Sequence, residues 1–281
     1  MPESPSSFGP LVDAAWLREH LDDGDVVVVD SRFDLTDPPA AERGWRAGHI
    51  PGAPFLDVGR DLSGAQRGDG ADGGRHPLPE PADFEKSARR AGISGGSRVV
   101  ACDETGEGGA ARLWWLLRHF GHDAVAVLDG GVQAWREAGG RLASGAEEPA
   151  PGGFTARPRS GDTVSAEEVL DQGAGPDGLR LLDARSPERF RGESEPVDPV
   201  AGHIPGAENV HFRELMLDGR MLTPEELRER LGEQPFVASC GSGITASVLV
   251  LAAERAGVET RLYPGSFSEW SRRGLSVERG E

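Results

Sequence analysis

The chain has 281 residues, of which 37% are hydrophobic and 27% charged, the balance of a soluble globular protein with room for two domains. Its 30 Lys and Arg residues against 47 Asp and Glu give a net charge of −17, which argues against nucleic acid or an anionic membrane as a partner. No signal peptide or membrane-spanning run is visible. Two cysteines, Cys102 and Cys240, are too few for a disulfide scaffold or a cysteine-built zinc site, so we expect a cytoplasmic protein without metal or cofactor.

The first half of the chain begins with alternating helix and strand signals. Residues 7–21 carry apolar side chains at helical spacing, which predicts an amphipathic helix. Residues 25–32 (DVVVVDSR) form a continuous apolar run that ends in Asp-Ser-Arg, the pattern of a strand buried on both faces. Residues 63–75 are rich in Gly and Asp and predict a surface loop.

The second half repeats this order of elements. Residues 164–170 open a predicted helix with Ser165 as its N-cap, and residues 179–185 supply the matching strand. The sequence AGHIPGA at residues 47–53 recurs at residues 201–207. Such a match in the same register indicates an internal repeat.

The repeat continues beyond this turn. Residues 98–103 align with residues 235–240, and Leu-Asp-Gly-Gly…Trp in the first half aligns with Leu-Tyr-Pro-Gly…Trp in the second. In this alignment Asp103 stands where the second half has Cys240. The second copy alone therefore carries a cysteine at this position.

The repeat predicts the domain organisation. We expect a first domain at residues 1–140, a linker rich in Gly, Pro, Ala and Ser at residues 141–161, and a second domain at residues 162–281. Strands that alternate with helices within each copy imply two α/β domains, each with a mainly parallel sheet and helices on both faces. Reactive groups in such sheets lie beyond the carboxyl ends of strands.

Cys240 lies at such a strand end. Residues 236–238 form a short apolar strand, and residues 245–256 form a helix that Gly257 ends. Between them Gly-Ser-Gly allows backbone N–H groups to turn inward together with the helix N-terminus, a concavity that favours an anion such as a thiolate. An isolated cysteine is often a small core residue, but the glycine-rich surroundings favour a reactive one.

Together these motifs resemble the tandem-domain rhodanese family of sulfurtransferases: two strands that end in Asp-x-Arg, two Gly-His-Ile-Pro-Gly-Ala turns, a cysteine loop only in the second copy, and a Gly-Gly or Pro-Gly…Trp ending. The resemblance covers nearly the whole chain. It implies an enzyme whose Cys240 accepts a sulfane sulfur as a persulfide and passes it to cyanide or a thiol, which could belong to a thioredoxin-like protein or a small molecule. The cycle would be ping-pong.

The loop sequence bears on the sulfur donor. Cys-Gly-Ser-Gly-Ile-Thr is similar to the loop of family members that prefer 3-mercaptopyruvate, whereas thiosulfate-preferring members usually place basic residues after the cysteine. A neutral loop suits the monoanion 3-mercaptopyruvate better than the dianion thiosulfate. By this resemblance the substrate-binding loop residues are Gly241, Gly243, Ile244 and Thr245. A thiosulfate-preferring enzyme is the alternative.

The resemblance also implies partners for the cysteine. Ser242 matches a loop serine that is proposed to act with a histidine and an aspartate on the substrate carbonyl. His76 matches the histidine by its His-Pro-Leu-Pro motif. Asp61 is our choice for the aspartate, although Gly59 occupies the nearest ungapped position and Asp57 is also close.

Carboxylate binding in this family usually falls to arginine, whose planar fork matches a carboxylate. Arg189 matches the principal arginine. A second arginine, expected in the mercaptopyruvate class, is missing, and Val197 and Asp198 stand in its region. This departure weakens the assignment of the donor.

Two other functions are weighed against sulfur transfer. A cysteine phosphatase would need Cys-x5-Arg, but Ala246 stands where the arginine should be. A persulfide carrier or binding module without turnover is a more remote alternative.

Other repeated residues are interpreted as structural. His49 and His203 occur in both copies, although only one copy has the cysteine, so we expect them to stabilise turns. The Asp-x-Arg pairs at the strand ends are expected to brace the sheets, and Cys102 is expected in a core.

Overall fold

The structure is a computed structural model that describes residues 8–175 and 178–280. The chain divides into two compact units. The first runs to Leu62 and includes Pro79–Arg159 and Asp218–Met221, whereas the second comprises Ser63–Leu78, Ser160–Leu217 and the chain from Leu222 onward. The Gly- and Asp-rich segment Ser63–Leu78 therefore packs with the second unit, although it lies within the first repeat in sequence.

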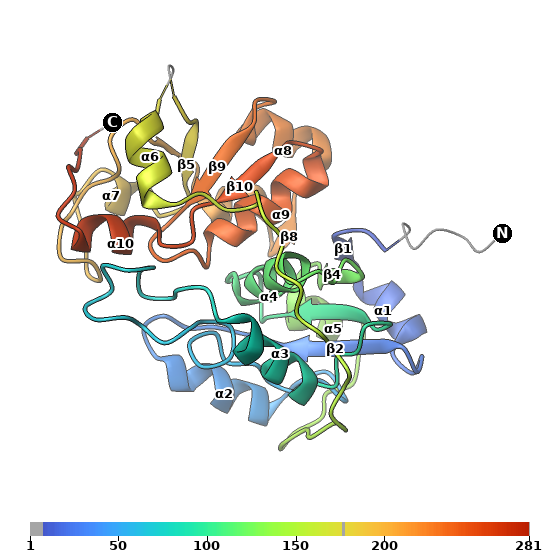
Figure 1. Cartoon of the computed structure of the whole chain (residues 1–281). Helices are drawn as coiled ribbons and strands as arrows, with labels where there is room; N and C mark the ends of the chain where they lie inside the picture. Colours follow the sequence, from blue (N-terminus) through green and yellow to red (C-terminus); the bar gives the residue numbers. More distant parts are fainter. Residues whose placement is uncertain (1–7, 176–177, 281) are drawn as a thin grey trace. The chain divides into compact units, whose positions relative to one another are not determined.

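The first unit is built on a parallel sheet. Its elements are β1 (Leu11–Val12), α1 (Ala14–His20), β2 (Val26–Asp30), α2 (Pro38–Ala47), α3 (Pro81–Arg90), β3 (Arg98–Cys102), α4 (Gly109–His119), β4 (Val125–Leu128), α5 (Gly131–Glu137) and β8 (Arg220–Met221). The strand order is β1-β4-β3-β2, and neighbouring strands run parallel. Figure 1 labels β1, β4 and β2 of this sheet.

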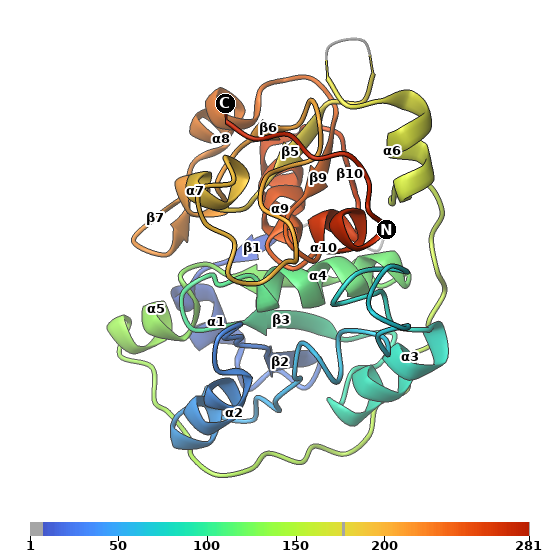
Figure 2. The ribbon, with the colours of Figure 1, turned by 90° about the vertical axis from the view of Figure 1, so that its left-hand side faces the viewer.

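The second unit repeats this plan. Its elements are α6 (Ala166–Gln172), β5 (Leu181–Asp183), α7 (Pro187–Phe190), β6 (Glu208–Asn209), the 3-10 helix η1 (Phe212–Leu215), β7 (Met216–Leu217), α8 (Pro224–Leu231), β9 (Phe236–Ser239), α9 (Ala246–Ala256), β10 (Thr260–Leu262) and α10 (Ser266–Arg272). The sheet order is β10-β9-β5-β6, again parallel. Figure 2 shows the helices of each unit gathered around its own sheet.

The two sheets correspond strand by strand. The order β4-β3-β2 matches β10-β9-β5. A parallel bridge between Thr163 and Leu262 occupies the place of the β1–β4 pairing, and a bridge between Asp30 and Phe55 the place of the β5–β6 pairing. The expected fold of two α/β domains, each with a parallel sheet, is confirmed.

Buried apolar residues form the core of each unit. Cys102, Leu17 and Trp135 belong to one cluster, and Phe267 and Trp270 belong to the equivalent cluster in the second unit. Cys102 is fully buried there, as expected for a core cysteine, and burial raises the pKa of its thiol well above the ordinary value.

The Asp-x-Arg pairs brace the strand ends as expected. Arg32 Nη2 lies 2.7 Å from Asp30 Oδ2 in the first unit, and Arg185 Nη2 lies 2.7 Å from Asp183 Oδ2 in the second. Each arginine also donates to the backbone carbonyl of the glycine before the repeated histidine. These buried pairs hold the strand to the turn that follows it.

The repeated histidines have structural partners. His49 Nδ1 lies 2.8 Å from the carbonyl of Trp45, on which its ring stacks. His203 Nδ1 lies 2.8 Å from the carbonyl of Phe190, and its ring stacks there too. These matching contacts support the turn-stabilising role.

The expected helix ends are largely confirmed. Ser165 caps α6 with a complete capping box, and Gly257 ends α9 in the left-handed conformation. The predicted helix at residues 7–21 is shorter, because Leu11–Val12 pairs as β1 and Asp13 then caps α1 through the N–H of Trp16. Residue 7 lies outside the described residues.

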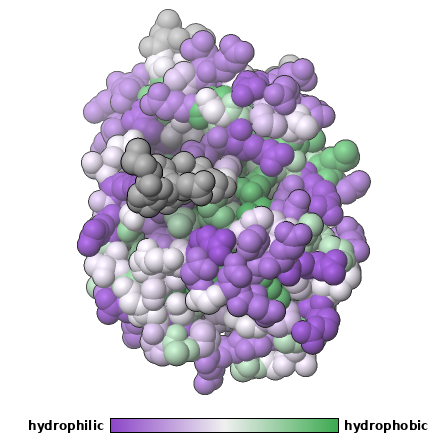
Figure 3. Space-filling model, turned by 90° about the vertical axis from the view of Figure 1, so that its right-hand side faces the viewer, coloured by the Kyte–Doolittle hydropathy of each residue, from purple (hydrophilic) through white to green (hydrophobic). Residues whose placement is uncertain are grey.

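Hydrophilic side chains predominate on the face shown in Figure 3, as the acidic composition leads one to expect. Among the described residues, no helix is both long and apolar enough to cross a membrane.

In the first unit, the loop after β3 binds the carboxylate of its own residue Asp103. It follows β3 as Cys240 follows β9, which confirms the alignment of the repeats. Its carboxylate accepts the backbone N–H groups of Gly106, Gly108 and Ala110 at 2.7, 3.2 and 3.2 Å. Burial, followed by the charge of Glu107, raises the pKa of Asp103 to about 7.

This raised pKa makes the first unit sensitive to pH. The unfolded carboxyl loses its proton near pH 4 and the folded one near pH 7, so the free energy of unfolding should fall by about 1.4 kcal/mol per pH unit in that window. Urea titrations at pH 4.5, 5.5 and 6.5 should show this slope in the wild type and a flatter one in Asp103→Asn. Equal slopes would refute the assignment.

Candidate active site

The Cys240 loop joins the end of β9 to α9. Cys240 is 2% exposed, and its Sγ accepts the backbone N–H of Gly243 at 3.1 Å. The N–H of Cys240 donates to Ser266 Oγ at 3.1 Å, so it is not directed at the sulfur. The loop therefore places one N–H on Sγ, in the way expected for a thiolate or a bound anionic sulfur.

Gly243 is required by this geometry. It has a φ of +78°, and an added Cβ would lie 2.5 Å from the carbonyl oxygen of Pro264. Ser247 Oγ donates to the Gly243 carbonyl at 3.0 Å and fixes the same peptide from the α9 side. A larger residue at position 243 would displace the N–H that contacts the sulfur.

The structure brings Ser242 and His76 together. His76 belongs to the segment Ser63–Leu78, and its Nδ1 lies 2.8 Å from Ser242 Oγ. Ser242 stands two residues after Cys240, so the same loop carries the thiol and a hydroxyl with a nitrogen partner. This pair can donate a proton or stabilise a developing oxyanion.

Arg189 lies at the same loop. An added Cβ at Gly241 would lie 3.5 Å from each terminal nitrogen of Arg189. Arg189 binds Glu195 with Nε and Nη2 at 3.1 and 2.8 Å, and Nη2 lies 3.2 Å from Asp198 Oδ2. Burial would raise the pKa of Glu195, but hydrogen bonds from Arg189 and from the backbone N–H of Asp198 lower it overall.

Arg75 is a site residue that the sequence analysis missed. The same added Cβ at Gly241 would lie 3.0 Å from its Nη2, and Arg75 Nη1 pairs with Asp198. Asp198 also binds Arg272 Nη1 at 2.9 Å. The position of Arg75 directly before His76 could have drawn attention to it, but a lone arginine in a Gly- and Asp-rich loop carries no periodic signal.

The other predicted loop residues have local roles. Ile244 is buried, and Thr245 immediately precedes α9 as its N-cap residue, with no side-chain cap hydrogen bond. Their backbone, with that of Gly241 and Gly243, forms the turn around the sulfur. Among the described residues, no group of three or more His, Cys, Asp or Glu side chains could hold a metal ion.

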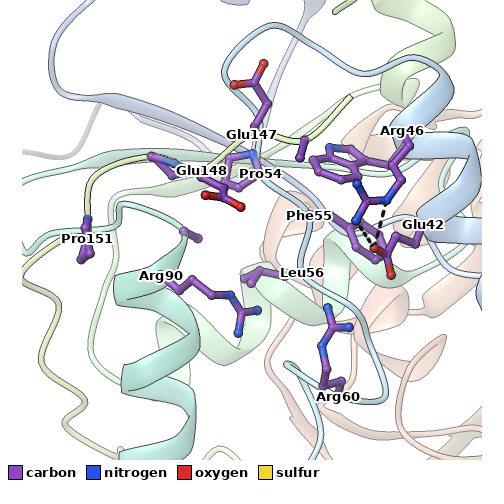
Figure 4. A pocket seen from close by; sticks show the side chains of 14 residues that line it. Glu42, Arg46, Pro54, Phe55, Leu56, Arg60, Arg90, Glu147, Glu148 and Pro151 are labelled. Atoms are coloured by element: carbon purple, nitrogen blue, oxygen red, sulfur yellow. Dashed lines mark hydrogen bonds and ion pairs between the residues drawn. The ribbon is translucent and has the colours of Figure 1, made fainter. Parts of the chain in front are cut away.

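Asp61 belongs to the first unit. Its buried carboxylate lies 3.0 Å from Arg60 Nη2 and 2.7 Å from Arg90 Nη2, and it accepts the N–H of Asp57 at 2.9 Å. Both arginines line a pocket of about 440 Å³ in that unit (Figure 4). The charge of Asp61 is balanced locally, and its place as the partner of His76 stays a prediction.

Comparison with known proteins agrees with these features. The Rhodanese-like domain model matches residues 13–138 and 165–273. A Pseudomonas aeruginosa protein assigned as a 3-mercaptopyruvate sulfurtransferase is 43% identical over 94% of this chain and 95% of its own length. A Mycobacterium tuberculosis protein assigned as a thiosulfate sulfurtransferase, SseB, is 41% identical over 93% of each chain. The crystal structure of SseA from Escherichia coli, a 3-mercaptopyruvate sulfurtransferase, has a TM-score of 0.78 at 33% identity and covers 93% of this chain and 100% of that one.

The role of Gly243 can be tested with a matched glycine. Gly243→Ala should slow alkylation of the Cys240 thiol at least about 10-fold, because the clash with Pro264 moves the N–H off the sulfur. Gly257→Ala is the control: its φ is also positive, at +71°, but an added Cβ there meets nothing within 4 Å. Both variants should lose about 1–2 kcal/mol of stability to the left-handed backbone. Equal alkylation rates in the two would contradict the proposed contact.

Proposed function

Because the chain belongs to the rhodanese family of sulfurtransferases, we propose that Cys240 carries a sulfur atom from 3-mercaptopyruvate to a thiol or cyanide. The observation that carries the choice of donor is the hydrogen bond between His76 and Ser242 of the Cys240 loop. A carbonyl is the group such a pair can act upon, and 3-mercaptopyruvate has one next to the carbon that bears its sulfur. Thiosulfate has none.

The proposed first half-reaction balances without a cofactor. The Cys240 thiolate attacks the donor sulfur, the S–S bond forms, and the C–S bond breaks with its electron pair left on carbon as the enolate of pyruvate. Ser242 Oγ donates a hydrogen bond to the enolate oxygen, with His76 Nδ1 as its partner. The enolate carbon then takes the proton that the donor thiol brought, which leaves pyruvate and the Cys240 persulfide anion.

In the second half-reaction an acceptor thiolate or cyanide attacks the outer sulfur. The S–S bond to Cys240 breaks, and its electron pair returns to the cysteine as a thiolate. The N–H of Gly243, which contacts Sγ at 3.1 Å, stabilises this leaving sulfur. We propose a small thiol or a thioredoxin-like protein as the acceptor and the cytoplasm as the location, where a reducing environment keeps the thiol free.

Charge at the site supports a monoanionic donor. Arg75, Arg189 and Arg272 face Glu195 and Asp198, and Arg185 links Glu195 to Asp183. Four positive charges against three negative ones leave +1. The Cys240 loop has no basic residue of its own. Arginines from other segments supply positive charge near it, and Glu195 and Asp198 neutralise most of that charge. The similar relatives are divided, since two of those named above are assigned to 3-mercaptopyruvate and one to thiosulfate, so the preference rests on the site itself.

Intact mass spectrometry tests the carrier. After brief exposure to 3-mercaptopyruvate, the wild type should gain one sulfur atom, which a thiol acceptor then removes. Cys240→Ser should gain none. Cys102→Ala, which removes the buried core thiol, should load like the wild type. Loading that depends on Cys102, or no loading at all, would contradict the proposal, and persulfide that no acceptor can remove would favour the carrier without turnover.

The Ser242 and His76 pair can be tested by donor choice. Ser242→Ala and His76→Gln should each lower kcat with 3-mercaptopyruvate about 10- to 100-fold, because the enolate oxygen loses its hydrogen bond. With thiosulfate the loss should stay below about 3-fold, since that donor forms no enolate. Steady-state release of pyruvate and of sulfite measures both. An equal loss with the two donors would indicate a structural role.

A further inference from the structure

We propose that Arg75 binds the carboxylate of the sulfur donor, together with Arg189, as the second arginine that the region of Asp198 lacks. This inference rests on the proposed function, because the carboxylate in question belongs to 3-mercaptopyruvate. The sequence between Glu195 and Asp198 offers no guanidinium. Arg75 comes instead from the segment Ser63–Leu78, which packs within the second unit.

The guanidinium of Arg75 has capacity left for a ligand. Its Nη1 is held by Asp198, whereas its buried Nε makes no hydrogen bond with any residue that the structure describes. Its Nη2 lies 3.0 Å from the place of a Cβ on Gly241, one residue from the thiol. A buried N–H donor without a partner is costly unless a ligand completes it.

Backbone hydrogen bonds fix Arg75 relative to the cysteine loop. The N–H of Arg75 donates to Ser268 Oγ at 3.1 Å, and the N–H of Ser268 donates to the Gly241 carbonyl at 2.8 Å. An added Cβ on Gly74 would lie 2.5 Å from Ser268 Oγ and from the Gly265 carbonyl oxygen. The chain thus passes so close to this turn that Arg75 has little freedom to lie elsewhere.

The three arginines that pair with Asp198 differ in the other hydrogen bonds that they make. Arg272 uses Nη1 for both Asp198, at 2.9 Å, and the Ser268 carbonyl, at 3.1 Å. Arg189 is already paired on two nitrogens with Glu195. Burial lowers the pKa of Arg75, the negative charge of Asp198 opposes that effect, and the positive charge of Arg189 adds to it. Of these arginines, Arg75 combines proximity to the loop with an N–H that lacks a partner among the described residues.

Gly241 has no side chain, and this leaves room for the two arginines at the loop. Because this residue has no side chain, the terminal nitrogens of Arg75 and Arg189 approach the loop within 3.0 and 3.5 Å of the absent Cβ. Two guanidinium groups that converge on one backbone position can bind the two oxygens of one carboxylate. The sulfur of such a donor would then lie toward Cys240.

The test compares 3-mercaptopyruvate with mercaptoacetone, which has a methyl group in place of the carboxylate. Arg75→Gln should lower kcat/KM for 3-mercaptopyruvate about 10- to 100-fold and for mercaptoacetone less than about 3-fold, as expected for the loss of a charged hydrogen bond. Arg75→Lys should restore part of the loss, since it keeps the charge without the fork. Arg228→Gln is the matched control: it removes an equal charge from the same unit, at a side chain that contacts the Ala256 carbonyl and Glu225, and should cost less than about 3-fold with either donor.

Calorimetry with pyruvate gives a readout that needs no turnover. Arg75→Gln should bind pyruvate about 10-fold more weakly than the wild type, and Arg228→Gln should not. Equal losses with both donors, or unchanged pyruvate binding, would overturn the role of Arg75. If the wild type transfers no sulfur but Arg75→Gln still weakens pyruvate binding, the proposed function fails and the carboxylate site stands.

Discussion

Three hydrogen bonds tie the Cys240 loop to the start of α10, and the geometry of the site depends on them. The N–H groups of Phe267 and Ser268 donate to the carbonyls of Cys240 and Gly241 at 3.0 and 2.8 Å, and Ser266 Oγ accepts the N–H of Cys240 at 3.1 Å. Ser266 adopts a φ of +51° to do so, a conformation that costs a non-glycine residue about 1–3 kcal/mol. The same turn binds Arg75 through Ser268, so one short segment positions both the nucleophile and a cation.

The two repeats share one arrangement of strand, loop and helix, but a different residue begins the loop in each. In the first unit the carboxylate of Asp103 accepts the N–H groups of its own loop and of the first turn of α4. In the second unit Cys240 stands at this position, and its sulfur accepts the N–H of Gly243. A loop that binds its own carboxylate cannot bind a substrate anion in the same place, which gives a physical reason to assign the proposed reactive site to the second repeat alone.

The sequence predicted the elements whose signals are local. The valine run of β2, the capping box at Ser165 and the end of α9 at Gly257 depend on periodicity or on one turn of chain, and the structure confirms each. The role of Arg75 could not be predicted in this way. Its place depends on the packing of Ser63–Leu78 against α10, between residues that lie almost 200 positions apart, as the Arg75 to Ser268 hydrogen bond shows with a separation of 193. Helical or strand periodicity carries no information about such a contact.

The charges of the site and the net charge of the whole chain both favour a monoanionic donor over a dianionic one. The net charge of −17 repels any anion that approaches, and the repulsion doubles from a monoanion to a dianion. The arginine cluster leaves +1 after Asp183, Glu195 and Asp198, which balances one carboxylate but not two negative charges. Salt at 0.1 M screens the repulsion between the chain and the donor beyond about 10 Å, but it weakens the interactions of the buried cluster less. In the proposed function, selectivity for a monoanion would therefore rest mainly on the buried carboxylate of Asp198, which pairs with Arg75 and limits the charge that Arg75 adds.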